Sequence, residues 1–207
     1  TSSTESHVVF GQGKDSSDIT MPLSIGQGLT IAGPMLTNYP YNTSASVEYV
    51  NKDNYSDYAI GIYNDNSRRD EIYVLNEGNS ASNTDLDIIT PAQGAKITLE
   101  EDNRVSDDFK NIGDFNGDGI DDFALATYKK VYVVYGKEDG LVNKNLTDFN
   151  NPEDGCIIYS SNNPDSNFYS VAGRFDANKD GRSDIIVSFY RPEGNKIAAI
   201  IYGNDQA

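Results

Sequence analysis

Hydrophobic residues along the chain fall into short runs, and stretches rich in Gly, Asn, Asp and Pro separate these runs. The runs are enriched in Ile, Val, Tyr and Phe, which is typical of β-strands bounded by turns. Between residues 109 and 159 the pattern predicts four strands: Phe109–Gly113, Phe123–Thr127, Val131–Tyr135 and Cys156–Tyr159. No helical periodicity extends beyond about two turns. Because the predicted strands are almost continuously apolar, we expect sheets that are covered on both faces.

Two markers recur along the chain at nearly the same spacing. Four apolar strands end in a glycine or an asparagine: Gly11, Asn76, Gly136 and Gly203. These residues are 65, 60 and 67 positions apart. Three segments rich in Asp and Asn end in Asp57, Asp122 and Asp184, at intervals of 65 and 62 positions. Two independent markers therefore indicate one internal repeat.

Each repeat has room for four short strands, which is the composition of one β-propeller blade. A solenoid is the structural alternative, but four strands in a repeat of this length suit it less well. We therefore expect an all-β protein with about three four-stranded blades. The expected repeats cover about residues 7–71, 72–130 and 131–196, with a terminal strand at residues 197–203.

The remaining segments are assigned from their composition and their place in the repeat. Residues 1–6 are polar, and we expect them to be disordered. The irregular segments 12–27, 78–93 and 137–154 recur at the same place in each repeat. This recurrence indicates insertions within blades rather than linkers between domains.

The expected strands do not complete a ring. Three repeats of four strands and a terminal strand make 13 strands, whereas propellers contain about four to eight four-stranded blades. An incomplete ring exposes strand edges and apolar faces, which can pair with another chain. We therefore expect either a homo-oligomer or a companion propeller segment, and a fragment of a longer propeller would meet the same expectation. An open wedge of three blades is the alternative.

The composition excludes several classes of protein. The 207 residues include 16 Lys and Arg against 32 Asp and Glu, which gives a formal net charge of −16. This charge opposes binding to nucleic acid and to anionic membranes, and no apolar run approaches the roughly 20 residues of a membrane span. The single cysteine, Cys156, cannot form an internal disulfide. The single histidine, His7, argues against a His-ligated metal site and against a catalytic histidine.

Part of the acidic excess is concentrated in two loops with the same spacing. Oxygen-bearing side chains occupy positions 1, 3, 5 and 9 of both loops: Asp114, Asn116, Asp118 and Asp122, then Asp176, Asn178, Asp180 and Asp184. Position 6 is glycine, which permits a sharp turn, and the backbone carbonyl of Ile120 or Arg182 at position 7 can supply another oxygen. Clustered carboxylates repel one another unless a cation lies between them. Oxygen ligands without His or Cys favour Ca²⁺, with Mg²⁺ or Mn²⁺ as competitors.

These loops differ from an EF-hand. Position 12, where an EF-hand has a bidentate Glu, is Leu125 or Val187 in this chain. The flanking segments are predicted strands rather than helices. The spacing therefore predicts calcium loops of a β-hairpin type, and the alternative is a polar surface turn that binds nothing.

A degenerate copy of the loop lies one repeat earlier. Tyr49 stands at position 1 and Asn54 at position 6, which leaves Asn51, Asp53 and Asp57 as oxygen-bearing side chains. We expect this loop to keep its turn and to bind calcium weakly or not at all. The sequence therefore predicts two Ca²⁺ sites.

Residues 109–126 resemble an FG-GAP repeat of the integrin alpha-subunit propeller, and residues 168–187 resemble the next repeat. Three strand endings are similar to the Phe-Gly element of that family: Phe10-Gly11, Tyr135-Gly136 and Tyr202-Gly203. The resemblance covers about residues 7–203. It implies a propeller with structural calcium loops on one face, a secreted or cell-surface location, and a function in adhesion or ligand binding.

A second hypothesis for the same fold is a carbohydrate-binding propeller. The chain has 14 Tyr, among them Tyr63, Tyr128 and Tyr190, which can line a sugar- or protein-binding surface. The absence of Trp is unfavourable to a lectin. A third hypothesis is a hydrolase with paired carboxylates, but the acidic residues of the two loops follow the spacing of cation ligands. We therefore expect a protein or glycan ligand and no enzymatic activity.

Overall fold

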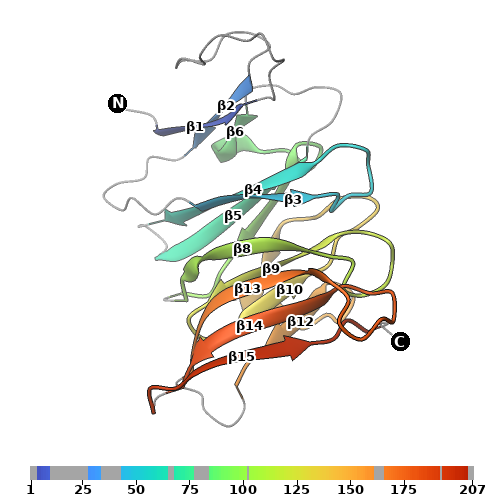
Figure 1. Cartoon of the computed structure of the whole chain (residues 1–207). Coiled ribbons are helices and arrows are strands. Elements are labelled where there is room, and N and C mark those ends of the chain that lie inside the picture. Colours follow the sequence, from blue (N-terminus) through green and yellow to red (C-terminus); the bar gives the residue numbers. More distant parts are fainter. Residues whose placement is uncertain are drawn as a thin grey trace, which may run out of the picture.

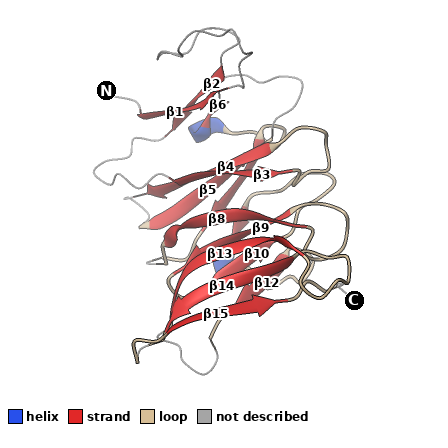
Figure 2. Ribbon diagram, viewed as in Figure 1, coloured by secondary structure: helices blue, strands red, loops and turns tan. Residues whose placement is uncertain are grey.

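The computed structural model describes eight stretches of the chain: residues 4–9, 28–33, 43–64, 68–76, 84–101, 103–160, 166–191 and 193–204. In these residues the protein is all-β, and the only helical elements are two short 3-10 turns (Figure 2). Four sheets, which we call A to D in chain order, follow one another through the molecule (Figure 1). The predicted all-β class is therefore confirmed. No helix in the described part of the chain has the length and apolar character needed to cross a membrane.

Sheet C is an antiparallel meander of four strands. In chain order they are β8 (Val105–Gly113), β9 (Asp122–Thr127), β10 (Val131–Val134) and β12 (Gly155–Ile158). Their spatial order is β12-β10-β9-β8. The four strands predicted between residues 109 and 159 are confirmed, although β8 begins earlier than predicted.

Sheet B has the same meander one repeat earlier. Its strands are β3 (Thr43–Glu48), β4 (Asp57–Asn64), β5 (Arg69–Leu75) and β7 (Gly94–Thr98). Leu75 in β5 and Val134 in β10 pair with equivalent glycines at the start of the fourth strand. Asn76 is therefore the counterpart of Tyr135, and not of Gly136 as the strand-end markers predicted.

Sheets D and A lie at the two ends of the described part of the chain (Figure 1). Sheet D consists of β13 (Asn167–Phe175), β14 (Asp184–Tyr190) and β15 (Lys196–Ile201). Sheet A pairs β1 (Thr4–Val9) with β2 (Gly28–Gly33). Residues 4–6, for which disorder was expected, belong to β1, whereas residues 1–3 and the segment 12–27 lie outside the described residues.

The connection from the third to the fourth strand of a sheet reaches back to the preceding sheet. In sheet B this connection contains β6 (Thr84–Asp85), parallel to β2, and then the 3-10 turn η1 (Leu86–Ile88). In sheet C it contains β11 (Lys144–Asn145), parallel to β7, and then η2 (Leu146–Asp148). These segments were expected to be irregular. They instead add a short edge strand that ties consecutive sheets together.

Sheet C is covered on both faces, as the apolar pattern predicted. Every residue of β9 is buried. Phe123 and Leu125 pack with residues of sheet B, whereas Ala124 and Ala126 pack with residues of sheet D. Burial of one large apolar side chain contributes about 1.5–3 kcal/mol. The continuous apolar strand therefore stabilises two sheet-to-sheet interfaces at once.

The first strands of three consecutive sheets lie next to one another. β8 contacts β3 of sheet B on one side and β13 of sheet D on the other (Figure 1). The three Asp- and Asn-rich loops follow directly after these three strands. The stacking of the sheets therefore brings the loops together.

Candidate functional site

Each candidate loop joins the first strand of a sheet to the second strand of the same sheet. We call the loop after β3 loop 1 (residues 49–57), the loop after β8 loop 2 (residues 114–122) and the loop after β13 loop 3 (residues 176–184). All three are among the described residues. The structure therefore places every side chain that the sequence singled out as a cation ligand.

The aspartate at position 1 organises loop 2. Asp114 Oδ1 accepts hydrogen bonds from the backbone N–H groups of Gly117 and Asp118, with N···O distances of 2.7 and 3.0 Å. Its Oδ2 accepts from the N–H of Gly119 at 2.8 Å. Gly117 and Gly119 have φ values of +81° and +83°, which glycine adopts without the steric cost that other residues bear. One carboxylate thus accepts hydrogen bonds from three backbone N–H groups of its own loop.

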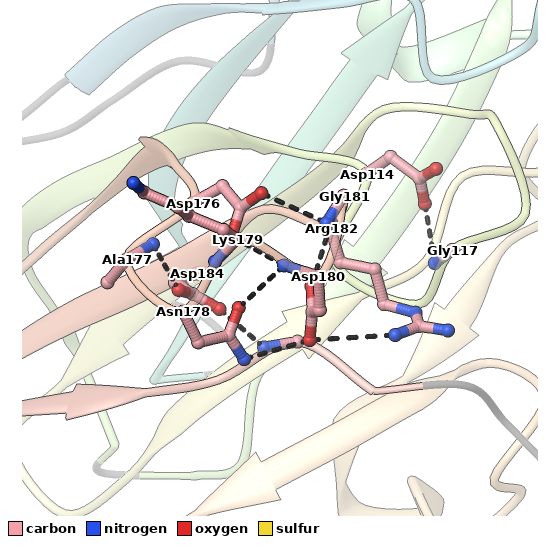
Figure 3. Close-up of polar contacts among 11 residues, drawn as sticks. Asp114, Gly117, Asp176, Ala177, Asn178, Lys179, Asp180, Gly181, Arg182 and Asp184 are labelled. Atoms are coloured by element: carbon pink, nitrogen blue, oxygen red, sulfur yellow. Dashed lines mark hydrogen bonds and ion pairs between the residues drawn. The ribbon is translucent and has the colours of Figure 1, made fainter.

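Loop 3 repeats this arrangement (Figure 3). Asp176 Oδ1 accepts from the N–H groups of Lys179 and Asp180 at 2.6 and 3.2 Å, and its Oδ2 accepts from Gly181 at 2.9 Å. Lys179 and Gly181 again have positive φ, at +64° and +90°. Two segments of different sequence therefore adopt the same hydrogen-bonded conformation one repeat apart.

Positions 3 and 5 are also linked in the same way in both loops. Asn116 Oδ1 accepts from the N–H of Asp118 at 3.1 Å, and Asn116 Nδ2 donates to Asp118 Oδ2 at 3.0 Å. The equivalent distances between Asn178 and Asp180 are 3.1 and 2.8 Å. The oxygen-bearing side chains at positions 1, 3 and 5 are thereby held on one loop.

The aspartate at position 9 connects the loop to the end of the third strand. Asp122 Oδ2 accepts from the N–H of Phe115 at 2.8 Å, and Asp122 Oδ1 accepts from the N–H of Gly136 at 2.9 Å. Asp184 Oδ1 likewise accepts from the N–H of Gly203 at 2.9 Å. Both aspartates are fully buried. The sequence did not predict this bond; its only signal is that both the glycine and the aspartate recur once per repeat, although their separation is 14 residues in one repeat and 19 in the other.

Glycine is required at these strand ends because backbone atoms approach closely. A Cβ on Gly136 would lie 2.4 Å from the carbonyl oxygen of Asp121 and 2.9 Å from that of Val50 in loop 1. A Cβ on Gly203 would lie 2.5 Å from the carbonyl oxygen of Ser183 and 2.6 Å from that of Phe115 in loop 2. The strand-end glycine therefore sits between its own loop and the loop of the preceding sheet.

Backbone hydrogen bonds join the three loops in series. The N–H of Asp121 in loop 2 donates to the carbonyl of Tyr49 in loop 1 at 3.3 Å. The N–H of Ser183 in loop 3 donates to the carbonyl of Asp114 in loop 2 at 2.8 Å. The donor is at position 8 and the acceptor at position 1 in both cases. The loops thus form one continuous layer at the edge of the sheets.

Arg174 in β13 strengthens the same layer from the side of the first strands. Its guanidinium forms an ion pair with Glu48 and donates to Asn111 Oδ1 at 3.0 Å. Asp121 Oδ2 lies 3.5 Å from the same nitrogen. The Arg174 side chain is 47% exposed, and exposed ion pairs contribute only about 0–1 kcal/mol.

Burial changes the acidity of one loop carboxylate strongly. Desolvation raises the pKa of Asp122 to about 8, although the N–H groups of Gly136 and Phe115 act in the opposite direction. The pKa of Asp180 is lowered, mainly by the backbone N–H of Arg182. A nearby cation would favour the ionised form of Asp122. A metal ion bound in loop 2 would therefore lower the pKa of the buried Asp122 carboxylate.

Loop 1 shares half of this arrangement. Asn51 Oδ1 accepts from the N–H of Asp53 at 3.1 Å, and Asp53 Oδ1 accepts from the N–H of Tyr55 at 2.7 Å. Asp57 is buried, but its Oδ1 receives a hydrogen bond from Asn51 Nδ2 at 3.4 Å. Tyr49, at position 1, has no carboxylate that could accept hydrogen bonds from the backbone N–H groups of the loop. The turn around positions 3 and 5 is therefore kept without the aspartate at position 1.

The donor set of loops 2 and 3 fits a hard cation in chemistry. The candidate side-chain ligands carry oxygen only, and each loop supplies three carboxylates and one amide. The described residues nevertheless hold no group of three or more His, Cys, Asp or Glu side chains in an arrangement that could hold a metal ion. Instead, the aspartate oxygens accept hydrogen bonds from the loop amides, and the guanidinium of Arg182 lies 3.5 Å from Asp180 Oδ2. The backbone N–H of Ile120, at position 7 of loop 2, donates to Asp118 Oδ1 at 2.9 Å.

Cys156 lies outside the loop layer. Its side chain is half-buried and packs against the core between sheets C and D. Burial raises the pKa of the thiol, so the reactive thiolate is disfavoured. The side chain of His7 is not among those described.

No protein-family model matches the chain, and no curated protein sequence matches it.

Proposed function

We propose that the protein is a calcium-binding module of the FG-GAP propeller type, in which calcium is structural and the blades serve extracellular or cell-surface protein interaction. The observation that carries this proposal is the hydrogen-bond scheme that loops 2 and 3 share, one repeat apart. Carboxylates at position 1, position 5 and position 9 recur in both loops: Asp114, Asp118 and Asp122, then Asp176, Asp180 and Asp184.

The arrangement of the sheets supports the propeller part of the proposal. Sheets B and C have the same strand order, and sheet D has the first three strands of that order. Their first strands β3, β8 and β13 are neighbours, as the innermost strands of propeller blades are. The short strand β11 ties sheet C to sheet B in the way that β6 ties sheet B to sheet A.

A calcium ion would supply positive charge among carboxylates that otherwise repel. The side chains of Asp114, Asn116, Asp118 and Asp122 would hold it in loop 2, with the carbonyl of Ile120 as a further oxygen. In loop 3 the ligands would be Asp176, Asn178, Asp180, Asp184 and the carbonyl of Arg182. Because Asp122 and Asp184 also bind the strand-end glycines, an ion in the loop would strengthen the attachment of the third strand.

Thermal unfolding with and without calcium tests the structural role. A ligand that binds only the folded state stabilises it by about 2.7 kcal/mol when its concentration is a hundred times Kd. We expect EDTA to lower Tm and excess Ca²⁺ to restore it, with a smaller effect of Mg²⁺. The matched control is the double variant Asp118→Asn with Asp180→Asn, which should no longer respond to calcium. An unchanged melting curve in EDTA would contradict the proposal.

The acidic surface points to the class of partner. A net charge of −16 disfavours nucleic acid and anionic membrane surfaces. We therefore propose a protein or glycan ligand. As part of the proposed FG-GAP propeller type, we also propose a secreted or cell-surface setting and an assembly with further blades from a second copy or a companion segment. No catalytic step is proposed.

A carbohydrate-binding propeller is the second candidate, and one observation favours it. The rings of Tyr169 and Tyr190 lie side by side on sheet D with centroids 4.8 Å apart and planes tilted by 40°, and Lys196 Nζ lies 5.2 Å from the centroid of the Tyr190 ring. Sugars bind to such exposed aromatic faces. Binding to a glycan array that is lost in Tyr190→Ala and retained in Tyr128→Ala would favour this candidate over a protein ligand.

A further inference from the structure

The outer edge of sheet D is an open strand. β15 pairs with β14 along its whole length without a bulge, and no strand in the described part of the chain pairs with its other edge (Figure 1). Natural edge strands are protected by proline, bulges or charges along the strand. β15 has none of these except Lys196 at its first position. Within the described residues, the backbone N–H and C=O groups on this outer edge face no partner strand.

The same edge exposes side chains whose counterparts are buried. Ile200 and Tyr202 are 51% and 56% exposed. The pairing of β15 with β14 makes them equivalent to Val133 and Tyr135 of sheet C, which are buried. In sheet C the strand β12 covers the edge of β10. A strand on β15 would accordingly bury an apolar edge that is otherwise in water.

We propose that β15 of a second copy of this chain pairs antiparallel with β15 across a two-fold axis. In the proposed register, Ala199 lies opposite Ala199 of the second copy. Ala198 then lies opposite Ile200, and Ile197 lies opposite Ile201. Small residues meet large ones on the exposed face, and aliphatic residues meet on the other face. The strand is therefore self-complementary.

Two cross-strand pairs of the proposed register resemble pairs that sheet C forms with its own fourth strand. Val131 and Val133 in β10 pair with Ile158 and Cys156 in β12. The equivalents of Val131 and Val133 are Ala198 and Ile200. In the proposed dimer their partners are Ile200 and Ala198 of the second copy, so an isoleucine replaces Ile158 and a small residue replaces Cys156. A second β15 thus offers side chains of similar size at the places of Ile158 and Cys156, whereas Ala199 and Ile197 of the second copy would stand where sheet C has Ile157 and Gly155.

Charge also favours this pairing. The register places Lys196 opposite Tyr202 of the second copy, and Lys196 already lies near an aromatic ring within its own sheet. A cation over an aromatic face is attractive. The strand carries no acidic residue, although the whole chain is strongly acidic. In the two-fold arrangement the β15 edge of each copy is occupied by the other copy. No further copy can then add at β15, so the assembly is a dimer. The proposed β15 pairing does not depend on calcium binding by loops 2 and 3.

Mass measurement by light scattering and sedimentation over a dilution series tests the proposal. We expect a species of twice the 22.7 kDa of one chain, both in Ca²⁺ and in EDTA at a temperature where the chain is folded. Ile200→Lys should weaken the dimer by at least about tenfold, because the lost cross-strand contact occurs twice. Val142→Lys is the control, since Val142 is 65% exposed and lies outside β15; it should leave the dimer unchanged.

Cysteine cross-linking tests the register separately. In a Cys156→Ala background, Ala199→Cys should give a covalent dimer on mild oxidation, because the two residues face each other on the axis. Ile201→Cys should give little covalent dimer, because residue 201 lies opposite Ile197 of the second copy and not opposite another residue 201. A monomer at all concentrations, an assembly that grows beyond a dimer, or a dimer unaffected by Ile200→Lys would overturn the proposal. A monomer that binds a separate FG-GAP repeat at this edge would identify a companion segment as the occupant instead.

Discussion

Loop 1 and loop 2 both follow the first strand of a sheet, but only the turn around positions 3 and 5 is the same in the two loops. Both link positions 3 and 5 by an asparagine and an aspartate, and both have a residue of positive φ between them, Lys52 and Gly117. Only loop 2 has an aspartate at position 1, and only there does position 6, Gly119, also have positive φ. Positions 3 and 5 therefore suffice for the first turn. The second turn of loop 2 closes where both Asp114 and Gly119 are present, and Asp114 adds a third carboxylate that loop 1 lacks.

The largest effect is expected at the strand-end glycine that anchors loop 2. Gly136→Ala would place a Cβ within 2.9 Å of two backbone carbonyl oxygens, from loops 1 and 2. Neither neighbour is a flexible side chain, so we expect a loss of about 3 kcal/mol of unfolding free energy, the upper range for overpacking. Urea denaturation measures this loss. Gly119→Ala is the matched control, because its Cβ would meet nothing within 4 Å and only its φ of +83° opposes the change. We expect that variant to lose about 1–2 kcal/mol, and an equal loss in both would contradict the account.

The next effect separates position 1 of the two loops. Asp114→Ala removes the acceptor of three backbone amides, and we expect a loss of about 1–3 kcal/mol together with the loss of one calcium site. Tyr49→Ala changes the equivalent position of loop 1, where the side chain is 43% exposed. It should alter unfolding free energy by less than about 0.5 kcal/mol. The prediction fails if the two variants are equally destabilised in EDTA or if Asp114→Ala keeps its full calcium response.

The buried carboxylate of loop 2 predicts a pH dependence of the metal-free protein. Burial raises the pKa of Asp122 from 3.8 to about 8. Between these values the folded protein holds a proton that the unfolded chain has released, so unfolding free energy falls as pH rises through this window. Asp122→Asn removes this titration and should flatten that part of the pH profile. Urea denaturation in EGTA at several pH values measures both slopes, and parallel profiles would count against the predicted role of Asp122.

The smallest effect on stability is expected from repairing loop 1. Tyr49→Asp with Asn54→Gly gives loop 1 the same residue types at positions 1 and 6 as loop 2. We expect the metal-free protein to change by less than about 1 kcal/mol, while the number of calcium ions bound rises by one. Tyr49→Asn with Asn54→Gly is the control, because it repairs the turn without the carboxylate. If both variants gained a site, position 1 would not be the deciding ligand.

The sequence was informative where a property repeats at fixed spacing. The strands of sheet C follow from apolar runs bounded by turn residues, and loops 2 and 3 follow from oxygen-bearing side chains at positions 1, 3, 5 and 9. The bonds from Asp122 to Gly136 and from Asp184 to Gly203 could not be predicted, because the partners are 14 and 19 residues apart. The length of the second hairpin differs between the repeats, so no fixed spacing marks the contact.

The edge strands β6 and β11 were missed for a different reason. Each has only two residues, which is too short for alternation of apolar and polar residues to be visible. Their position depends on a parallel partner in the preceding sheet, and that partner is distant in sequence. Backbone pairing across sheets, rather than local propensity, decides these elements.

Isothermal titration calorimetry with Ca²⁺ gives the number of sites per chain and so tests whether loops 2 and 3 bind calcium. We expect two Ca²⁺ per chain, one in loop 2, which contains Asp114, and one in loop 3, which contains Asp176. The single variants Asp118→Asn and Asp180→Asn should each leave one site, and Asp53→Asn in loop 1 should leave both. Absence of binding, or a third site removed by Asp53→Asn, would contradict this expectation.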